Sequence, residues 1–98
     1  GLGSIGRHPP LAWAMSMGVV FHKLVAKDVG SVFRYYEDEG GIDLANQFYS
    51  EFERVVTRIK ENPERFHRIS DDLRRANFQR FPYHLVFRPT SSEIRVLV

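Results

Sequence analysis

The feature that most constrains the fold is a change in the spacing of apolar residues along the chain. Between Leu24 and Ile59, apolar side chains recur every three or four residues, which is typical of the buried face of a helix. From Leu73 onward they alternate with polar side chains, which is typical of strands with one buried face. The sequence therefore predicts helices followed by a sheet within one small α+β domain.

Two amphipathic helices are expected in the first half. The apolar positions of the first are Val25, Val29, Val32, Phe33 and Tyr36. Gly40-Gly41 interrupts this pattern, as expected of a helix stop followed by a turn. The apolar positions of the second are Ile42, Ala45, Phe48, Phe52, Val55, Val56 and Ile59, and Asn62-Pro63 ends it because the residue before proline avoids the α region. Helices joined by so short a link are expected to lie antiparallel, as a helical hairpin.

Four strands surround this hairpin in the sequence. Residues 19–22 are β-branched or aromatic and predict a strand before the first helix. Alternation then predicts strands at residues 73–81, ended by Pro82, at residues 83–88, and at residues 93–98 after the turn 89–92. The last three form an antiparallel meander. The predicted order is β-α-α-β-β-β, an antiparallel sheet with a helical hairpin packed on one face.

The chain divides at about residue 18. Residues 1–18 are rich in glycine and contain Pro9-Pro10 but no periodic pattern, so they are interpreted as an N-terminal extension or a cloning remnant. Residues 19–98 form the predicted domain. No apolar run approaches the roughly 18 residues that a membrane helix needs, and the stretch 11–21 lacks the basic start of a signal peptide. The chain has no cysteine, which excludes disulfides and Cys-ligated zinc and suits the cytoplasm.

Charge is unevenly distributed although the net charge is only +2. Residues 37–53 contain six acids and no Lys or Arg, whereas residues 54–80 contain eight bases and four acids. Such asymmetry is compatible with an ordinary solvated surface or with a basic surface facing an acidic or anionic partner. Alternation assigns to the sheet face away from the helices Arg75, Asn77, Gln79, His84, Val86, Arg88, Arg95 and Leu97.

The candidates for function lie on this open face. Arg75, Arg88 and Arg95 fall on three successive strands and are predicted to bind a target through their planar guanidinium groups, together with Asn77 and Gln79. Arg74 and Arg80 are expected to point toward the helices and to be structural.

Proton transfer has two candidates. His84 is the histidine predicted on the open face and titrates near neutral pH, so it is the first. Tyr83, expected to pack inward with its hydroxyl at the rim, is the second. Asp71-Asp72 is interpreted as a turn. His8, His22 and His67 show no metal-ligand spacing, so neither a metal nor a cofactor is expected.

Several short sequence motifs follow one another along the chain at a characteristic spacing. They are residues 33–37 (Phe-Arg-Tyr-Tyr-Glu), Ala45 with Phe48, residues 59–66 (Ile-Lys-Glu-Asn-Pro-Glu-Arg-Phe), residues 73–75 (Leu-Arg-Arg), residues 80–83 (Arg-Phe-Pro-Tyr) and Phe87-Arg88. In this order and spacing, over about eighty residues, the chain resembles the ParE/RelE toxin family of type II toxin–antitoxin and plasmid stabilisation systems. The resemblance implies a small cytoplasmic toxin neutralised by a cognate antitoxin, whose C-terminal segment folds as it wraps around the toxin.

The resemblance leaves three functions open. A ParE-like toxin binds DNA gyrase and does no chemistry. A RelE-like toxin is an endoribonuclease that cleaves mRNA on the ribosome, here with Arg75, Arg88 and His84. A degenerate member would bind its antitoxin without being toxic. The scarcity of catalytic side chains on the open face favours the gyrase inhibitor. Members of the family commonly continue with a short basic or histidine-rich tail, and without it RelE-like cleavage would lack a participant.

Overall fold

The computed structural model describes residues 11–98. A short helix, α2 (Ala12–Met15), precedes strand β1 (Val19–Phe21) and the long helix α3 (Lys23–Glu61). A 3-10 turn, η1 (Pro63–Arg65), then leads into strands β2 (His67–Arg68), β3 (Arg74–Asn77), β4 (His84–Pro89) and β5 (Ile94–Val96). The predicted α+β class is confirmed.

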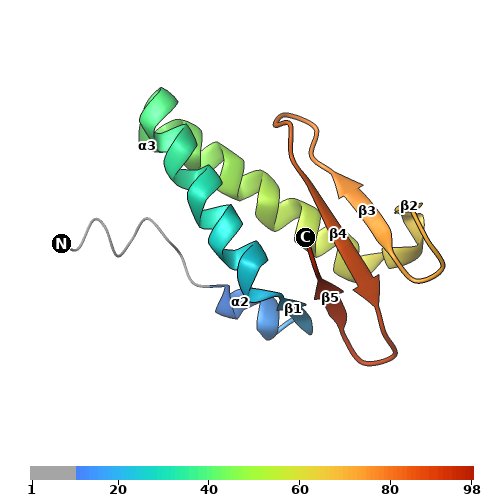
Figure 1. Ribbon diagram of the computed structural model, residues 1–98. Coiled ribbons are helices and arrows are strands. Elements are labelled where there is room, and N and C mark those ends of the chain that lie inside the picture. Colours follow the sequence, from blue (N-terminus) through green and yellow to red (C-terminus); the bar gives the residue numbers. More distant parts are fainter. Residues whose placement is uncertain (1–10) are drawn as a thin grey trace.

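The helical hairpin is built from α3, which folds back on itself. Its first turn is capped by His22, whose ring Nδ1 accepts a hydrogen bond from the backbone N–H of Leu24 at 3.1 Å. At Gly41 the backbone leaves the helical conformation (φ 83°, ψ 179°), and the two halves of α3 then run antiparallel (Figure 1). The predicted stop at Gly40-Gly41 is therefore where the chain reverses.

The sheet has five strands in the order β1-β5-β4-β3-β2. The pairs β3–β4 and β4–β5 are antiparallel, as the meander predicted. Strand β1 lies beside β5 and is parallel to it, so the sheet is mixed rather than antiparallel throughout. The hairpin carries the chain away from β1, and the meander then brings β5 back to it in the same direction. Strand β2 was not predicted, because its two residues are too few to show an alternation.

Three of the four predicted strands are shorter than the sequence predicted, and β4 is displaced by one residue. Strand β3 ends at Asn77 rather than residue 81. At the end of β5 the N–H groups of Leu97 and Val98 both donate to the carbonyl of Val86, at 2.8 and 3.3 Å, while the N–H of Val86 donates to the carbonyl of Val98. This is the pattern of a β-bulge. The bulge interrupts the alternation of side chains, so Val98 does not face the core and is 63% exposed.

The core lies between the hairpin and one face of the sheet (Figure 1). At its centre, the fully buried ring of Phe48 contacts the rings of Phe78, Phe81 and Tyr83 at centroid distances of 5.4 to 5.7 Å. Because the helices cover this face, the opposite face of the sheet is left open.

Residues 11–18 also contribute to the core, although they precede the predicted domain of residues 19–98. Ala14 is fully buried, and the indole N–H of Trp13 donates to the hydroxyl of Tyr49 at 3.0 Å. The Trp13 ring also meets Phe52 edge-on at 6.1 Å. Over residues 11–98, no helix combines the length and the apolar character that crossing a membrane requires.

Candidate functional site

The open face of the sheet carries the residues that alternation assigned to it, except Gln79, which lies beyond the end of β3. On the helix side, Ala76, Leu85, Phe87, Ile94 and Val96 are buried, so the residues between them point to the other side. The strand register then sets their neighbours. Arg88 lies directly opposite Arg95, Arg75 opposite Val86, and Asn77 opposite His84. We call this set (Arg75, Asn77, His84, Val86, Arg88, Arg95 and Leu97) the outer face.

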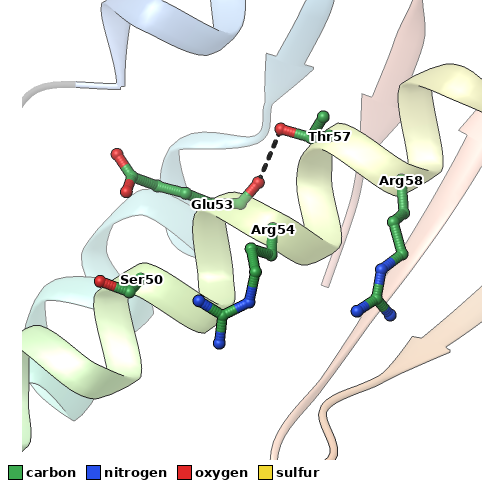
Figure 2. Close-up of a pocket in the computed structure, with 5 residues that line it drawn as sticks. All are labelled: Ser50, Glu53, Arg54, Thr57 and Arg58. Carbon is green, nitrogen blue, oxygen red and sulfur yellow. Dashed lines mark hydrogen bonds between the residues drawn. The ribbon is translucent and has the colours of Figure 1, made fainter.

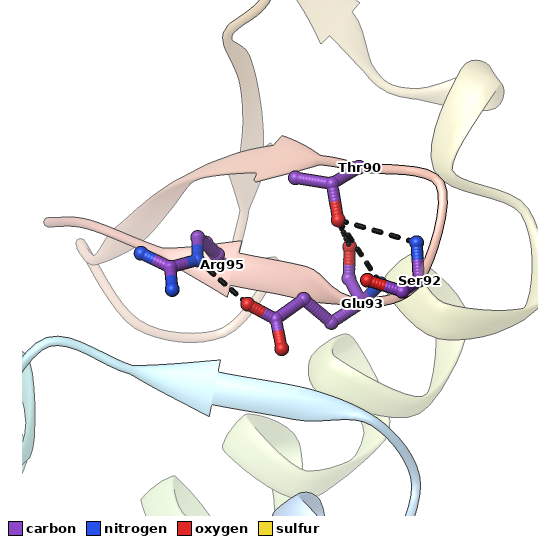
Figure 3. A network of polar contacts seen from close by, with 4 residues as sticks. All are labelled: Thr90, Ser92, Glu93 and Arg95. Atoms are coloured by element: carbon purple, nitrogen blue, oxygen red, sulfur yellow. Dashed lines mark hydrogen bonds and ion pairs between the residues drawn. The ribbon is translucent and has the colours of Figure 1, made fainter.

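Two of the outer-face arginines are held by neighbouring carboxylates. Arg88 forms an ion pair with Asp72, with 3.6 Å between its Nη1 and the carboxylate Oδ2. The Nε of Arg95 donates to Glu93 at 2.6 Å. Figure 3 shows Glu93, which lies just before β5, bonded to Arg95 of β5, next to the turn closed by Thr90. Both acids are exposed or partly exposed, since the side chains of Asp72 and Glu93 are 61% and 28% accessible.

Arg75 has a different environment. Its Nε is buried, yet within residues 11–98 it has no hydrogen-bond acceptor. His67 of β2 lies opposite Arg75 on one side and Val86 of β4 on the other, so the guanidinium stem is flanked by both. A buried donor without an acceptor loses its hydration without compensation.

The two candidates for proton transfer lie on opposite sides of the sheet. His84 is exposed on the outer face beside Asn77. Tyr83 points toward the helices, as expected, and its hydroxyl donates to Asp28 of α3 at 2.8 Å. Burial, followed by the hydrogen bond and charge of Asp28, raises the pKa of Tyr83 well above its usual value. Through this hydrogen bond Tyr83 connects the start of β4 to α3.

Gln79 does not lie on a strand, although it was predicted on the outer face as part of residues 73–81. Its backbone N–H donates to the carboxylate of Glu51 at 2.5 Å, and the N–H of Arg80 donates to the same carboxylate at 3.2 Å. These bonds from α3 draw the backbone out of the sheet after Asn77. Glu51 is only 5% exposed. In the sequence Glu51 belongs to the acidic stretch of residues 37–53, and nothing in that stretch indicates this buried role.

The two arginines expected on the helix side are there. Arg74 donates to the backbone carbonyls of Glu64 and Phe66 at 3.2 and 2.9 Å. The guanidinium of Arg80 donates to the side chain of Gln47 on α3 at 2.8 Å. Both fasten the sheet to neighbouring segments.

A second polar surface lies on the second half of α3. An open depression there is lined by Ser50, Glu53, Arg54, Thr57 and Arg58, and Figure 2 shows Arg54 and Arg58 projecting from successive turns. The Thr57 hydroxyl donates to the backbone carbonyl of Glu53 at 2.9 Å. Glu53 and Glu61 alternate with the arginines along this helix, so it presents mixed rather than single-sign charge.

The register sets the spacing of the candidates for proton transfer and phosphate binding. His84 and Arg88 are four residues apart on β4, which separates their Cα atoms by roughly 14 Å at about 3.4 Å per residue. Arg75 is diagonal to both His84 and Arg88 across β3 and β4, at a separation of roughly 7–8 Å. Among residues 11–98 no group of three or more His, Asp or Glu side chains has the arrangement of a metal site.

Comparisons with known proteins agree with this architecture. The chain matches over residues 19–98 the family described as the ParE toxin of the type II toxin–antitoxin system, parDE. Among solved structures it is similar to the chromosomal ParDE toxin–antitoxin system from P. aeruginosa, with a TM-score of 0.70 and 17% sequence identity. That alignment covers 82% of this chain and 89% of the other. No curated protein matches it.

Proposed function

We propose that this chain, which belongs to the ParE toxin family of type II toxin–antitoxin systems, inhibits DNA gyrase by binding it through the outer face of the sheet. The family match over residues 19–98 carries the proposal. It favours the gyrase-binding toxins over the ribosome-dependent nucleases among the functions that the sequence left open.

The outer face supports a binding toxin that does no chemistry of its own. It carries three arginines on adjacent strands, positioned by a sheet whose other face is fixed to the helical hairpin. Arginine is enriched among the residues that dominate protein–protein binding energy.

A cognate antitoxin is the second partner that we propose, and the cytoplasm is the compartment in which both are expected to act. A small domain gains stability from any partner that binds only its folded state. The antitoxin is therefore expected to raise the unfolding temperature of the toxin and to abolish growth inhibition.

Supercoiling by purified gyrase tests the proposal directly. The full chain, added at micromolar excess, is expected to inhibit supercoiling of relaxed plasmid, and a heat-unfolded sample should not. Unchanged supercoiling by the folded protein would reject the gyrase target.

Expression in growing cells separates the three functions. With DNA and protein synthesis labelled separately, gyrase inhibition predicts that DNA synthesis falls first. An early fall in protein synthesis, with cuts in mRNA on ribosomes, would indicate the endoribonuclease instead. Normal growth would indicate a member that binds antitoxin without being toxic.

A further inference from the structure

The positions of the charged side chains on the outer face, and not only the sign of their charge, indicate the chemistry of the partner. Arg88 and Arg95 lie directly opposite each other on neighbouring strands, where Cβ atoms are about 4.5–5.5 Å apart and like charges are destabilising. Arg75 is diagonal to Arg88 in the register, at a separation of roughly 7–8 Å. Three guanidinium groups therefore surround one small area of the sheet.

Each of the facing arginines is balanced by a carboxylate that binding can displace. Asp72 lies in the turn before β3 and Glu93 just before β5, and both reach the outer face from its margin. Ion pairs at such exposure contribute only about 0.2–1 kcal/mol. Replacing these ion pairs with ion pairs to carboxylates of another molecule therefore costs little free energy. Because Asp72 and Glu93 already bind Arg88 and Arg95, carboxylates are the groups that fit beside these arginines.

Arg75 belongs to the same cluster. Its Nε is buried and residues 11–98 supply no acceptor for it, so a bound carboxylate could reach only the terminal nitrogens of its guanidinium. Charged acceptors form the strongest hydrogen bonds with arginine.

The remainder of the outer face fits a polypeptide better than a nucleic acid. Val86 and Leu97 lie next to each other between the arginines and are partly exposed, so they offer an apolar contact. Among the outer-face residues, the exposed imidazole of His84 is the one aromatic ring that could stack on a nucleic-acid base, and the set contains no Phe, Tyr or Trp.

We infer that Arg75, Arg88 and Arg95 bind an acidic segment of a partner protein, whose carboxylates replace Asp72 and Glu93 and whose apolar side chain contacts Val86 and Leu97. The inference rests on the proposal that the outer face contacts the target protein, and it specifies the chemistry of that target. Asp72 and Glu93 compete with the partner for Arg88 and Arg95, and this competition weakens the binding of segments that carry few carboxylates.

The first test is a titration of the full-length protein, followed through the side-chain Nε–Hε signals of its arginines by NMR. The probes are a blocked peptide of sequence Asp-Leu-Glu-Val-Glu, its uncharged counterpart Asn-Leu-Gln-Val-Gln, and oligothymidylate. We expect the acidic peptide to shift the signals of Arg75, Arg88 and Arg95 and to leave Arg54 on α3 unchanged. Equal binding of the uncharged peptide, or tighter binding of oligothymidylate, would overturn the inference.

Variants test the competing acids. Asp72→Asn combined with Glu93→Gln should tighten binding of the acidic peptide about two- to fivefold, the range expected from removing weak exposed ion pairs. Arg88→Ala and Arg95→Ala should each weaken it by at least as much. Arg88→Lys should fall in between, because lysine keeps the charge but loses the fork. Arg54→Ala is the matched control and should have no effect. Unchanged affinity in the Asp72/Glu93 variant would contradict the role given to these acids.

The gyrase assay distinguishes failure of this inference from failure of the proposed function. If the peptide results hold but supercoiling is unaffected by the wild-type protein, the ligand class stands and gyrase is not the target. If supercoiling is inhibited equally by the wild-type protein and by Arg88→Ala and Arg95→Ala, gyrase is the target and the arginine site is rejected.

Discussion

Glu51 shows how one residue sets the geometry next to the outer face. It is the charged side chain that lies in the core of the described chain, and an isolated buried carboxylate is strongly unfavourable. The N–H groups of Gln79 and Arg80 offset this by donating to it. Through these bonds Glu51 closes the loop after β3 and holds Phe78 and Phe81 against Phe48.

Replacement of Glu51 by alanine should be strongly destabilising. It leaves two backbone donors without their acceptor, and hydrogen bonds to a charged group contribute about 1.5–3 kcal/mol each. We expect the free energy of unfolding to fall by roughly 2–4 kcal/mol in urea denaturation. Glu53→Ala, two residues away and exposed, should change it by about 0.5 kcal/mol or less. An unaltered midpoint for Glu51→Ala would mean that other contacts hold the loop.

At the scale of elements, the reversal of α3 depends on one backbone conformation. Gly41 has φ 83° and ψ 179°, a region that is essentially restricted to glycine. A Cβ atom added there would meet nothing within 4 Å. The requirement for glycine therefore comes from the backbone alone and not from packing.

Gly41→Ala should lower the free energy of unfolding by about 1–3 kcal/mol, the usual range for a residue forced into a sparsely populated conformation. Thermal unfolding followed by circular dichroism would measure it. Glu39→Ala, exposed two residues earlier, is the control and should have little effect. A gain in stability from Gly41→Ala would show that the helices do not reverse through this conformation.

At the scale of the whole molecule, contacts between distant segments join the hairpin to the sheet. The hydroxyl of Tyr83, at the start of the third predicted strand, bonds Asp28 on the first half of α3. The ring of Tyr83 also packs on Phe48 of the second half. One side chain thus connects both halves of the hairpin to the sheet.

Stability should fall in alkaline solution because of this contact. The pKa of Tyr83 is raised above the ordinary value of 10.0, first by burial and then by Asp28. Below about pH 10 the phenol is neutral in both states and the contact is fully present. Above it, the unfolded chain ionises while the folded chain keeps its proton, which favours unfolding. The pKa of Tyr49 is raised by burial in the same direction.

The measurement is the free energy of unfolding at about pH 8 and about pH 11, where an ordinary tyrosine is respectively neutral and mostly ionised. Wild type should lose more stability between these values than Tyr83→Phe, which cannot ionise at this position. Tyr35→Phe, at an exposed tyrosine of the same chain, should behave like wild type. Equal losses in wild type and Tyr83→Phe would contradict the assignment.

The sequence alone determined most of the elements and which of their side chains share a face. Periods of about 3.6 and 2 residues follow from local backbone geometry, so they revealed the hairpin, the meander and the outer-face positions of Arg75, Arg88 and Arg95. The tertiary structure decided which segments meet. It placed β1 parallel to β5 and brought Asp72 beside Arg88. It also buried Glu51, whose carboxylate accepts a hydrogen bond from a loop residue 28 positions away. These contacts depend on how whole elements pack against one another, and the spacing of neighbouring residues carries no record of that packing.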